Sequence, residues 1–568
     1  MKIFNALFVF AIVITLLSDC AQKNVTTSSG MAHRIAYDDS TLFQTSAPYL
    51  MPYNRIIDGA GESVSFGNPD TENHSLDAVM LSDGKTLAVE DRFGLTFLDA
   101  NAHKVISEWT YRKDSPYKGS MSSFSGIKSI VYHDSTFVFV GAGGRGDVNS
   151  YVLQLFWNGR VARFIRIIPF QPVAPATIAL PNEVWPAVEN GQLYLYVVLN
   201  GNNQLAKVAI NTGKVAWSVP TGMAPYGLRI IGSKAYITNW AGPVPDTTDG
   251  FETAGIPWGN AYVDPRTGAI SRGSVSVIDI ARGTSAGELK VGLHPNAIIA
   301  SPDQRYLYVA NGNSDYVSVI DVGAQQVVDS IFVGLFSKGN GPIGSTPNGL
   351  AISNDGGTLY VANGMDNALC VVSLGDPGQR FDNSRVRIKG YIPTEAYPSG
   401  IVIHGGELCV TNLEAIGPRV GHPTEPLNNS ATGKTVMAYN SHRQLASVSF
   451  IPIPDEGQLK VFTDKVKKQS LTFRLALAQQ APRKNVAPKP VPDRIGEPSV
   501  FKHVLYIIKE NRTYDQIMGD MPTGKGEPSL CIFGDSITPN QHQIAREFLL
   551  LDNYYASGKA SAEGHHWA

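Results

Sequence analysis

Short apolar runs separated by turn residues recur along most of the chain. The two clearest copies, residues 294–303 and 346–355, share a Pro-Asn pair, and each is followed by Tyr-Val-Ala-Asn, at 308–311 and 360–363. The copies are 52 residues apart at both landmarks, because 347 − 295 and 360 − 308 both equal 52. Each copy then continues into a Val-rich run. Short β-rich runs punctuated by Gly, Asp and Asn predict repeated antiparallel units of about four strands.

Weaker copies of the pattern bring the number of units to seven. A four-stranded antiparallel unit cannot cover both of its faces alone, and radial repetition solves this while leaving only short edges. The sequence therefore predicts a mainly β fold, with a seven-bladed β-propeller over residues 41–458. Residues 55–66 form a spare strand, which we expect to close the ring by pairing into the blade that contains residues 408–412. The units begin near residues 74, 123, 178, 225, 294, 346 and 397.

Two insertions, residues 241–273 and 414–435, interrupt the repeat. Both follow the same strand of their blades, so both are expected to emerge on one face of the propeller. Loops longer than about 12–15 residues inside a compact domain are usually functional or disordered. Two interpretations stay open, because the insertions are equally consistent with binding loops and with idle surface loops.

The pattern changes after the last repeat. Apolar residues at helical spacing predict a helix from residue 459, and a Pro-rich linker completes a segment that ends at residue 500. The apolar run 503–508 is typical of a strand buried on both faces of a parallel sheet. A helix after Asp515, another helix at 540–548 and a second strand at 549–555 follow. Residues 501–568 are therefore predicted to open an α/β domain.

Charge and the N-terminal segment indicate where the protein resides. Lys and Arg number 47 against 49 Asp and Glu, so no basic excess suggests a nucleic-acid partner. Lys2 precedes an apolar stretch, residues 7–17, that is short for a membrane span. The stretch ends in Leu17-Ser18-Asp19-Cys20, which resembles a bacterial lipobox. We expect a signal peptide over 1–19, a tether over 20–40 and a lipidated Cys20 in the bacterial cell envelope, on the periplasmic or outer-membrane face. A plain secretory signal is the alternative.

Two family resemblances rest on these motifs. The repeat resembles the YVTN family of seven-bladed propellers. The run Glu510-Asn511-Arg512-Thr513, followed by Leu-Asp-Asn-Tyr-Tyr at 551–555 and Ser-Ala-Glu-Gly-His-His-Trp at 561–567, resembles the phosphoesterase family. That family includes acid phosphatases and bacterial phospholipases C, and belongs to the alkaline phosphatase superfamily. The whole arrangement is similar to exported proteins that fuse such a propeller to such a domain.

The phosphoesterase resemblance implies hydrolysis of a phosphate ester at a divalent metal ion, such as zinc or calcium. Glu510 and Asn511 match the family's metal-binding pair, Ser561 matches its nucleophile, and His565 is expected to orient the phosphate or support the metal shell. Simpler interpretations stay open, because Glu510 and Asn511 suit a helix N-terminus and Ser561 suits an N-cap. Ser557 is a rival nucleophile without the Gly-His-His-Trp context.

The resemblance also implies that the site is incomplete within these 568 residues. The family takes its remaining metal ligands, an Asp pair and often a His, from far downstream of the motif. We therefore expect the chain as printed to be inactive. The alternative hypothesis is a non-enzymatic cell-envelope propeller that binds a partner and carries a vestigial C-terminal segment.

Overall fold

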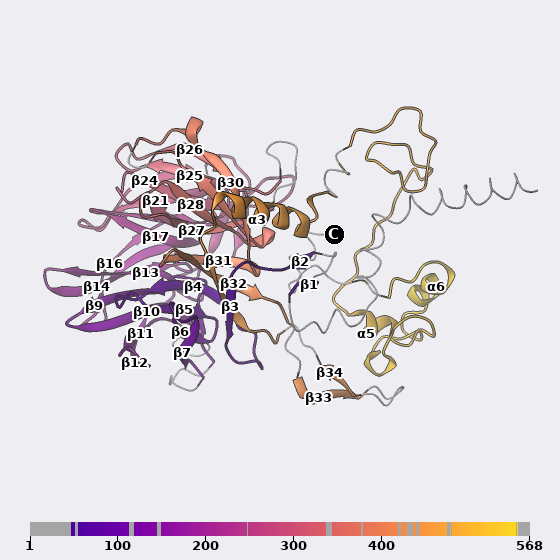
Figure 1. The fold of residues 1–568 in the computed structure, drawn as a ribbon, viewed down its shortest axis with the longest axis horizontal. Coiled ribbons are helices and arrows are strands. Elements are labelled where there is room, and N and C mark those ends of the chain that lie inside the picture. Colours follow the sequence, from indigo (N-terminus) through magenta and orange to yellow (C-terminus); the bar gives the residue numbers. More distant parts are fainter. Residues whose placement is uncertain are drawn as a thin grey trace, which may run out of the picture. The chain divides into compact units, whose positions relative to one another are not determined.

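The computed structural model describes residues 47–554 apart from short gaps, at 51–54, 113–118, 145–148, 247, 337–343, 377–378, 419–421, 429–434, 439–441, 474–477, 479 and 553. The chain divides into two compact units. The propeller unit comprises Asp58–Val420 and Tyr439–Gln479. The second unit comprises Met1–Ile57, Gly421–Ala438 and Gln480–Ala568. Each unit is described by itself (Figure 1).

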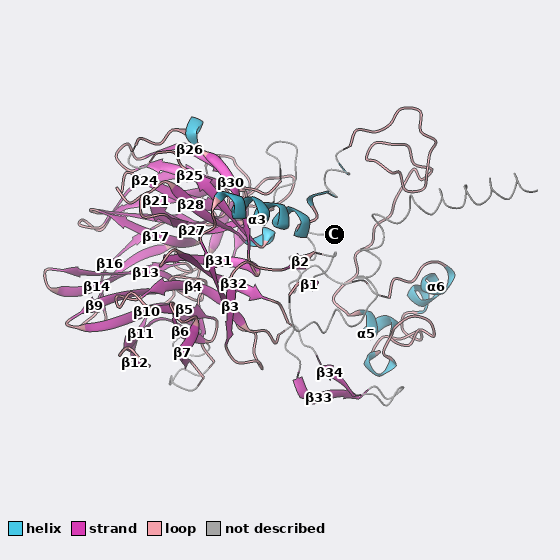
Figure 2. Ribbon diagram, viewed as in Figure 1, coloured by secondary structure: helices cyan, strands magenta, loops and turns pink. Residues whose placement is uncertain are grey.

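Seven antiparallel sheets follow one another along the propeller unit, so the predicted seven-bladed propeller is confirmed (Figures 1 and 2). Blade 1 consists of β4 (Ser75–Met80), β5 (Thr86–Asp91), β6 (Gly94–Asp99) and β7 (Lys104–Thr110). Blade 2 consists of β8 (Met121–Ser122), β9 (Lys128–Tyr132), β10 (Ser135–Gly143), β11 (Ser150–Trp157) and β12 (Ala162–Pro169). Blade 3 consists of β13 (Pro181–Glu189), β14 (Gln192–Leu199), β15 (Gln204–Ala209) and β16 (Lys214–Pro220).

Blades 4 to 7 repeat this arrangement. Their strands are β17 (Pro225–Ile231), β18 (Lys234–Asn239), β21 (Gly273–Asp279) and β22 (Thr284–Val291); β23 (Pro295–Ala300), β24 (Tyr306–Asn311), β25 (Tyr316–Asp321) and β26 (Gln326–Phe332); β27 (Pro347–Ile352), β28 (Thr358–Asn363), β29 (Ala368–Ser373) and β30 (Arg387–Pro393); and β31 (Ala396–His404), β32 (Glu407–Ala415), β35 (Ala446–Pro452) and β3 (Glu62–Phe66). First strands of neighbouring blades contact one another, as β13 does with β17 and β31 with β4, so these strands surround the axis.

The last blade closes the ring with a strand from the opposite end of the unit. β3 pairs antiparallel with β35, with Val64 opposite Val448, and β35 pairs with β32. The prediction that the spare N-terminal strand completes this blade is therefore confirmed. β3 is thus the outer strand of blade 7, and it joins the N-terminal end of the propeller unit to its last blade.

Large apolar side chains fill the spaces between blades. Phe97 of blade 1 stacks on Trp157 of blade 2, with ring centroids 4.2 Å apart and planes 6° apart. The exposed fractions are 0% for Phe97 and 4% for Trp157. Burying a large apolar side chain stabilises a fold by about 1.5–3 kcal/mol, so such stacked pairs bind each blade to the next.

His103, between β6 and β7, links blade 1 to both sides of the closure. Its Nδ1 lies 2.9 Å from Glu62 of β3 and its Nε2 lies 3.0 Å from Glu407 of β32. Its ring also stacks on Phe450, with centroids 4.1 Å apart. Burial lowers the pKa of His103, but the hydrogen bonds and charges of Glu62 and Glu407 outweigh burial and raise it above its ordinary value.

This raised pKa predicts that the closure weakens as the pH rises. A histidine whose folded pKa exceeds its unfolded value stabilises the fold fully below the unfolded pKa, and this stability is lost as the pH rises through the folded pKa. We expect the melting temperature of the wild type to fall as the pH rises above about 6.5, and to fall less in His103→Gln. Calorimetry across this range measures both slopes, and equal slopes would contradict the assignment.

Both insertions connect the second and third strands of their blades, as predicted. The first, between β18 and β21, contains the hairpin of β19 (Thr253–Ile256) and β20 (Gly259–Tyr262). The second, between β32 and β35, contains β33 (His422–Asn428) and β34 (Thr435–Ala438), which belong to the other unit.

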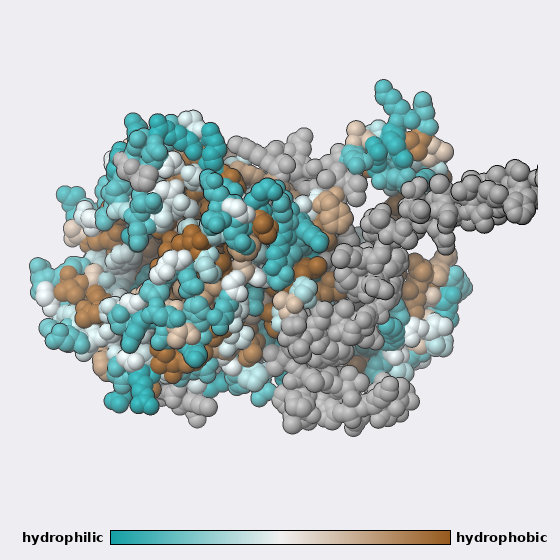
Figure 3. Space-filling view, in the orientation of Figure 1, coloured by the Kyte–Doolittle hydropathy of each residue, from teal (hydrophilic) through white to brown (hydrophobic). Residues whose placement is uncertain are grey.

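One helix is part of the propeller unit. α3 (Glu456–Gln469) starts at Asp455, whose side chain accepts a hydrogen bond from the Gln458 N–H at 2.8 Å. The Thr463 hydroxyl of α3 accepts a hydrogen bond from the Tyr391 N–H of β30 at 2.9 Å. Hydrophilic residues cover the visible face of α3 (Figure 3). The helix predicted from residue 459 is therefore present, and it packs on blade 6.

The second unit contains the predicted helices without the predicted strands. The structure has β1 (Tyr49–Leu50), β2 (Ile56–Ile57), α5 (Tyr514–Met518) and α6 (Pro539–Glu547). Residues 503–508 form no strand, and the exposed fractions reach 85% for Val504 and 86% for Leu505. The second predicted strand is also absent from the described part of residues 549–555. A parallel strand requires a neighbouring strand, and the described residues from 480 onward contain none.

Candidate functional site

The predicted metal-binding pair lies just before α5. Glu510 and Asn511 are exposed and belong to neither a helix nor a strand. The residue that caps α5 is Thr513, whose backbone N–H donates to Gln516 Oε1 at 3.1 Å. The alternative that Glu510 and Asn511 serve as the N-cap is therefore wrong. Ser561 and His565 lie outside the described residues, as does Cys20, so their roles stay predictions.

An ion pair between a buried histidine and an exposed carboxylate connects two segments of this unit. His542 of α6 is fully buried, and its Nε2 lies 2.8 Å from Asp520. Asp520 also accepts a hydrogen bond from the Asp535 N–H at 2.9 Å. That backbone bond and then the bond to His542 lower the pKa of Asp520 to about 2. The pair ties α6 to the segment that follows α5, and sequence reasoning did not identify it.

The propeller carries an unexpected cluster of charged residues near its axis. Asp77 lies on β4, Glu90 on β5, Lys128 on β9 and Glu183 on β13. Asp77 and Glu90 are directly paired across their two strands. Lys128 Nζ lies 2.5 Å from Glu183 Oε1. These four residues, here called the axial cluster, come from three consecutive blades and surround Lys128 with carboxyl groups.

Burial controls the electrostatics of the axial cluster. Burial raises the pKa of Asp77 and Glu183, although Lys128 opposes the rise in both. Burial raises the pKa of Glu90 well above its ordinary value, and the charges of Asp77 and Glu183 raise it further. Burial lowers the pKa of Lys128, but attraction to Glu183 and Asp77 outweighs it and the net shift is upward. The cluster therefore combines a lysine whose pKa is raised with carboxyl groups whose pKa values are also raised.

Four aromatic rings, here called the aromatic cluster, pack against one another near the propeller axis. Tyr226 stacks on Trp240 with centroids 4.5 Å apart, and Trp240 stacks on His294 at 4.7 Å. Phe124 approaches Trp240 to 4.9 Å. Phe124 precedes β9 of blade 2, whereas Tyr226 and Trp240 belong to blade 4. Blades 2 and 4 are not neighbours in the ring, so the contact between Phe124 and Trp240 spans the position of blade 3.

The signal for the aromatic cluster is present in the repeat. The backbone N–H after the second strand donates to the carbonyl before the first strand in five blades. These hydrogen bonds run from Arg92 to His74 at 3.1 Å, Asn200 to Leu180 at 2.9 Å, Trp240 to Ala224 at 3.0 Å, Gly312 to His294 at 2.9 Å, and Gly364 to Thr346 at 3.0 Å. The backbone is thus alike in the five blades, and among these five residues only Trp240 carries an aromatic ring. Trp240 is therefore recognisable in the sequence as a departure from the repeat.

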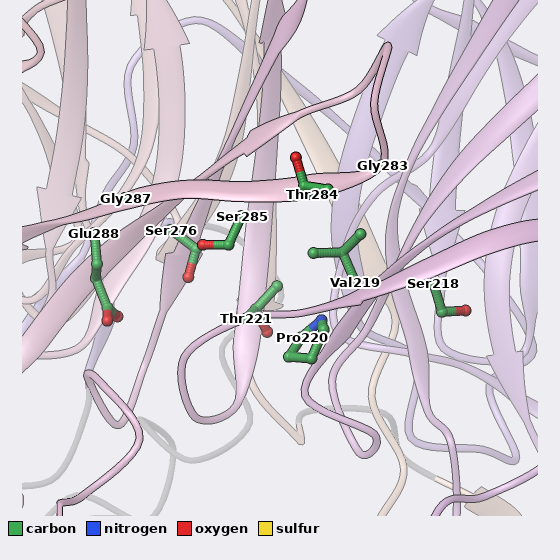
Figure 4. Close-up of a pocket in the computed structure, with 10 residues that line it drawn as sticks. All are labelled: Ser218, Val219, Pro220, Thr221, Ser276, Gly283, Thr284, Ser285, Gly287 and Glu288. Carbon is green, nitrogen blue, oxygen red and sulfur yellow. The ribbon is translucent and has the colours of Figure 1, made fainter.

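A groove with many hydroxyl groups opens between blades 3 and 4 at their outer strands. It has a volume of about 420 Å³. The Ser274 hydroxyl donates to Glu288 at 2.6 Å beside it. Figure 4 shows that the lining side chains come from both sides of the groove, which separates β16 from β22. Its lining residues are Ser218, Val219, Pro220, Thr221, Ser276, Gly283, Thr284, Ser285, Gly287 and Glu288.

Neither a metal site nor a membrane span is evident in the described residues. They contain no group of three or more His, Cys, Asp and Glu side chains arranged to hold a metal ion. None of their helices is long and apolar enough to cross a membrane. The metal predicted for Glu510 and Asn511 therefore requires ligands besides these two.

Among known proteins, only solved structures are similar to this chain. No family model matches the chain. No curated protein matches it. Hydrazine synthase of Kuenenia stuttgartiensis shares 15% identity, with 66% of this chain and 97% of that chain covered and a TM-score of 0.42. U3-55K shares 9% identity, with 69% and 100% covered and a TM-score of 0.45. At these values neither similarity bears on what this chain binds or catalyses.

Proposed function

We propose that the protein is an exported, lipid-anchored phosphoesterase that uses Ser561 as its nucleophile and Glu510 and Asn511 as metal ligands. The observation that supports this proposal is the three-part motif at 510–513, 551–555 and 561–567. Each part is short, but the three occur in the order and context of the phosphoesterase family. The propeller would then be a companion domain on the same anchored chain.

Two features of the second unit are compatible with the proposal. Glu510 and Asn511 present side-chain oxygens, which are the ligands that hard divalent cations prefer. The apolar run 504–508 is exposed throughout, with fractions from 49% at Ile508 to 86% at Leu505. A contiguous exposed apolar segment is typical of an interaction surface. In the proposal, this segment becomes a strand when the remainder of the family's sheet covers it.

The proposed reaction has two displacement steps. The Ser561 oxygen attacks phosphorus, and the bond from phosphorus to the leaving-group oxygen breaks. Water then attacks the phosphoserine, which releases inorganic phosphate and restores the hydroxyl. A divalent cation, when bound, would neutralise negative charge on the transferred phosphoryl group and favour ionisation of the Ser561 hydroxyl. Ser561 at a helix N-terminus would favour the phosphate oxygens further, and His565 would orient them.

A metal-affinity measurement tests the assignment of Glu510. In a form of the chain that continues through the downstream ligands, Glu510→Gln should weaken zinc or calcium binding by about 10–100-fold, because the charged ligand is lost. Isothermal titration of the metal-free protein measures this change. Glu547 is an exposed residue of α6 in the same unit. The Glu547→Gln variant is the matched control, and it should bind metal as the wild type does. Equal loss in both variants would overturn the assignment.

A further inference from the structure

A second groove, here called the Arg166 groove, lies between blades 2 and 3. It has a volume of about 580 Å³, within the range of roughly 300–1,000 Å³ that small-molecule sites occupy. Blade 2 contributes residues of β9, β10, β11 and β12, and blade 3 contributes the turn between β13 and β14 and the end of β15. The lining residues are Tyr132, Phe137, Gln154, Ile165, Arg166, Asn190, Gly191, Gln192, Leu193, Ile210 and Asn211.

Arg166 is a departure from the repeat. In blades 1 to 6 a β-bulge interrupts the pairing of the third and fourth strands at the same place, and Arg166 is the fourth-strand residue of the last pair before the bulge of blade 2. The equivalent residues of the other five blades share neither charge nor size, so the fold does not require an arginine here. They are Ser107, Trp217, Gly287, Asp329 and Gly390.

Two hydrogen bonds hold the Arg166 guanidinium in the groove. Nε donates to Gln154 Oε1 at 2.9 Å, and Nη2 donates to the backbone carbonyl of Ile210 on the blade 3 side. Nη1 donates to no acceptor among the described residues, and it is not buried. A guanidinium carries two N–H donors on this nitrogen and stays protonated in proteins. The fold therefore positions the cation and leaves two of its donors available.

The groove holds no acid to balance this cation. None of its lining residues is Asp or Glu. Burial lowers the pKa of Arg166, and no charged group among the described residues opposes this shift. Lys207, which occupies the position of Gln154 in the next blade, is instead paired with Glu189 at 2.6 Å. Burying a charge costs free energy unless a partner compensates it, so the groove is complementary to an anion.

Apolar and aromatic side chains flank the guanidinium. Ile165, the extra residue of the bulge, is 45% exposed, and Tyr132 and Phe137 are partly exposed. The Tyr132 hydroxyl donates to the Gly191 carbonyl at 2.9 Å, which connects the two walls of the groove. One cation beside apolar surface matches a ligand that has one negative charge and an apolar body.

We propose that the Arg166 groove binds a small organic monocarboxylate, whose carboxylate accepts hydrogen bonds from Arg166 Nη1 and whose apolar body contacts Ile165 and Phe137. A carboxylate has one negative charge and two acceptor oxygens, which match one guanidinium with two available donors. A phosphate monoester carries about two negative charges at neutral pH, and the single cation would leave one of them unpaired. The site is independent of the phosphoesterase proposal, because every residue involved belongs to the propeller unit.

Isothermal titration with 4-phenylbutyrate at constant pH and ionic strength tests the site. We expect saturable binding to the wild type and a loss of affinity of at least about tenfold in Arg166→Gln, because hydrogen bonds between charged groups are the strong ones. Arg163 is exposed on the same strand, β12, and does not line the groove. Arg163→Gln is therefore the matched control and should bind as the wild type does. 4-Phenylbutanamide has the same shape without the charge and should bind at least about tenfold more weakly.

Two further variants separate binding from structure. Arg166→Lys keeps the charge and loses the planar fork, so it should retain more affinity than Arg166→Gln. Ile165→Ser removes an apolar contact and should weaken the binding of 4-phenylbutyrate by at least about threefold. Circular dichroism verifies that each variant is folded, and the comparison of carboxylate with amide uses the wild type alone. Absence of binding, equal binding of the amide, or wild-type affinity in Arg166→Gln or in Ile165→Ser would each overturn the proposal.

Discussion

Replacement of Lys128 by methionine is expected to lower the free energy of unfolding of the propeller by about 3 kcal/mol. Lys128 Nζ lies 2.5 Å from Glu183, and Asp77 and Glu90 complete its surroundings. Methionine fills a similar volume but removes the charge that balances these acids. Lys128 is itself 28% exposed, but the Glu183 side chain is only 11% exposed. Removing the lysine leaves this buried carboxyl group without its cation, which costs more than the pair contributed.

Denaturant titration with a surface ion pair as control measures this effect. Lys465→Met removes the partner of Asp58, which lies 2.7 Å away with both side chains about one-third exposed, at 31% and 33%. Such surface pairs contribute about 0–1 kcal/mol. We therefore expect Lys465→Met to be nearly neutral. Equal effects of the two variants would show that the axial cluster contributes no more than a surface pair.

The loss in Lys128→Met should also grow as the pH rises. Without the lysine, the pKa values of Asp77 and Glu183 rise further above their unfolded values, because the group that opposed burial is gone. Acids with raised folded pKa values destabilise the fold as the pH rises through the range between the unfolded and folded pKa. The difference in unfolding free energy between variant and wild type should therefore be smaller at pH 5 than at pH 8, and a constant difference would contradict this account.

Replacement of Ser561 by alanine is expected to reduce phosphate-ester hydrolysis by at least about a thousandfold, because a covalent route without its nucleophile is closed. The test uses a form of the chain in which metal-dependent hydrolysis by the wild type is measurable. Metal affinity should be unchanged, which separates this variant from Glu510→Gln.

Hydrolysis of p-nitrophenyl phosphate, with and without chelator, measures the effect of Ser561→Ala. Ser557→Ala is the matched control, because Ser557 is the nearby serine without the Gly-His-His-Trp context. It should retain activity. If Ser557→Ala abolishes hydrolysis and Ser561→Ala does not, the nucleophile is misassigned. If chelator and Ser561→Ala both leave the rate unchanged, the proposed mechanism is wrong.

The sequence alone determined the propeller and the way it closes. Each blade is built from local strands and short turns, so its signature is repeated within about 50 residues and is readable without distant contacts. The spare strand at 55–66 was also predictable, since it has strand character and lies before the first of the seven repeat units. The helices α5 and α6 follow from local periodicity in the same way.

Only the tertiary structure decided which residues meet at the axis. Phe124 and Trp240 lie more than a hundred residues apart, and their contact depends on the radius of the closed ring. Glu90 is an unremarkable strand residue in sequence, and it becomes a buried, unpartnered carboxyl only when blades 1 to 3 surround it. The run 503–508 shows the converse, because an apolar segment with strand character forms no strand unless another strand lies beside it.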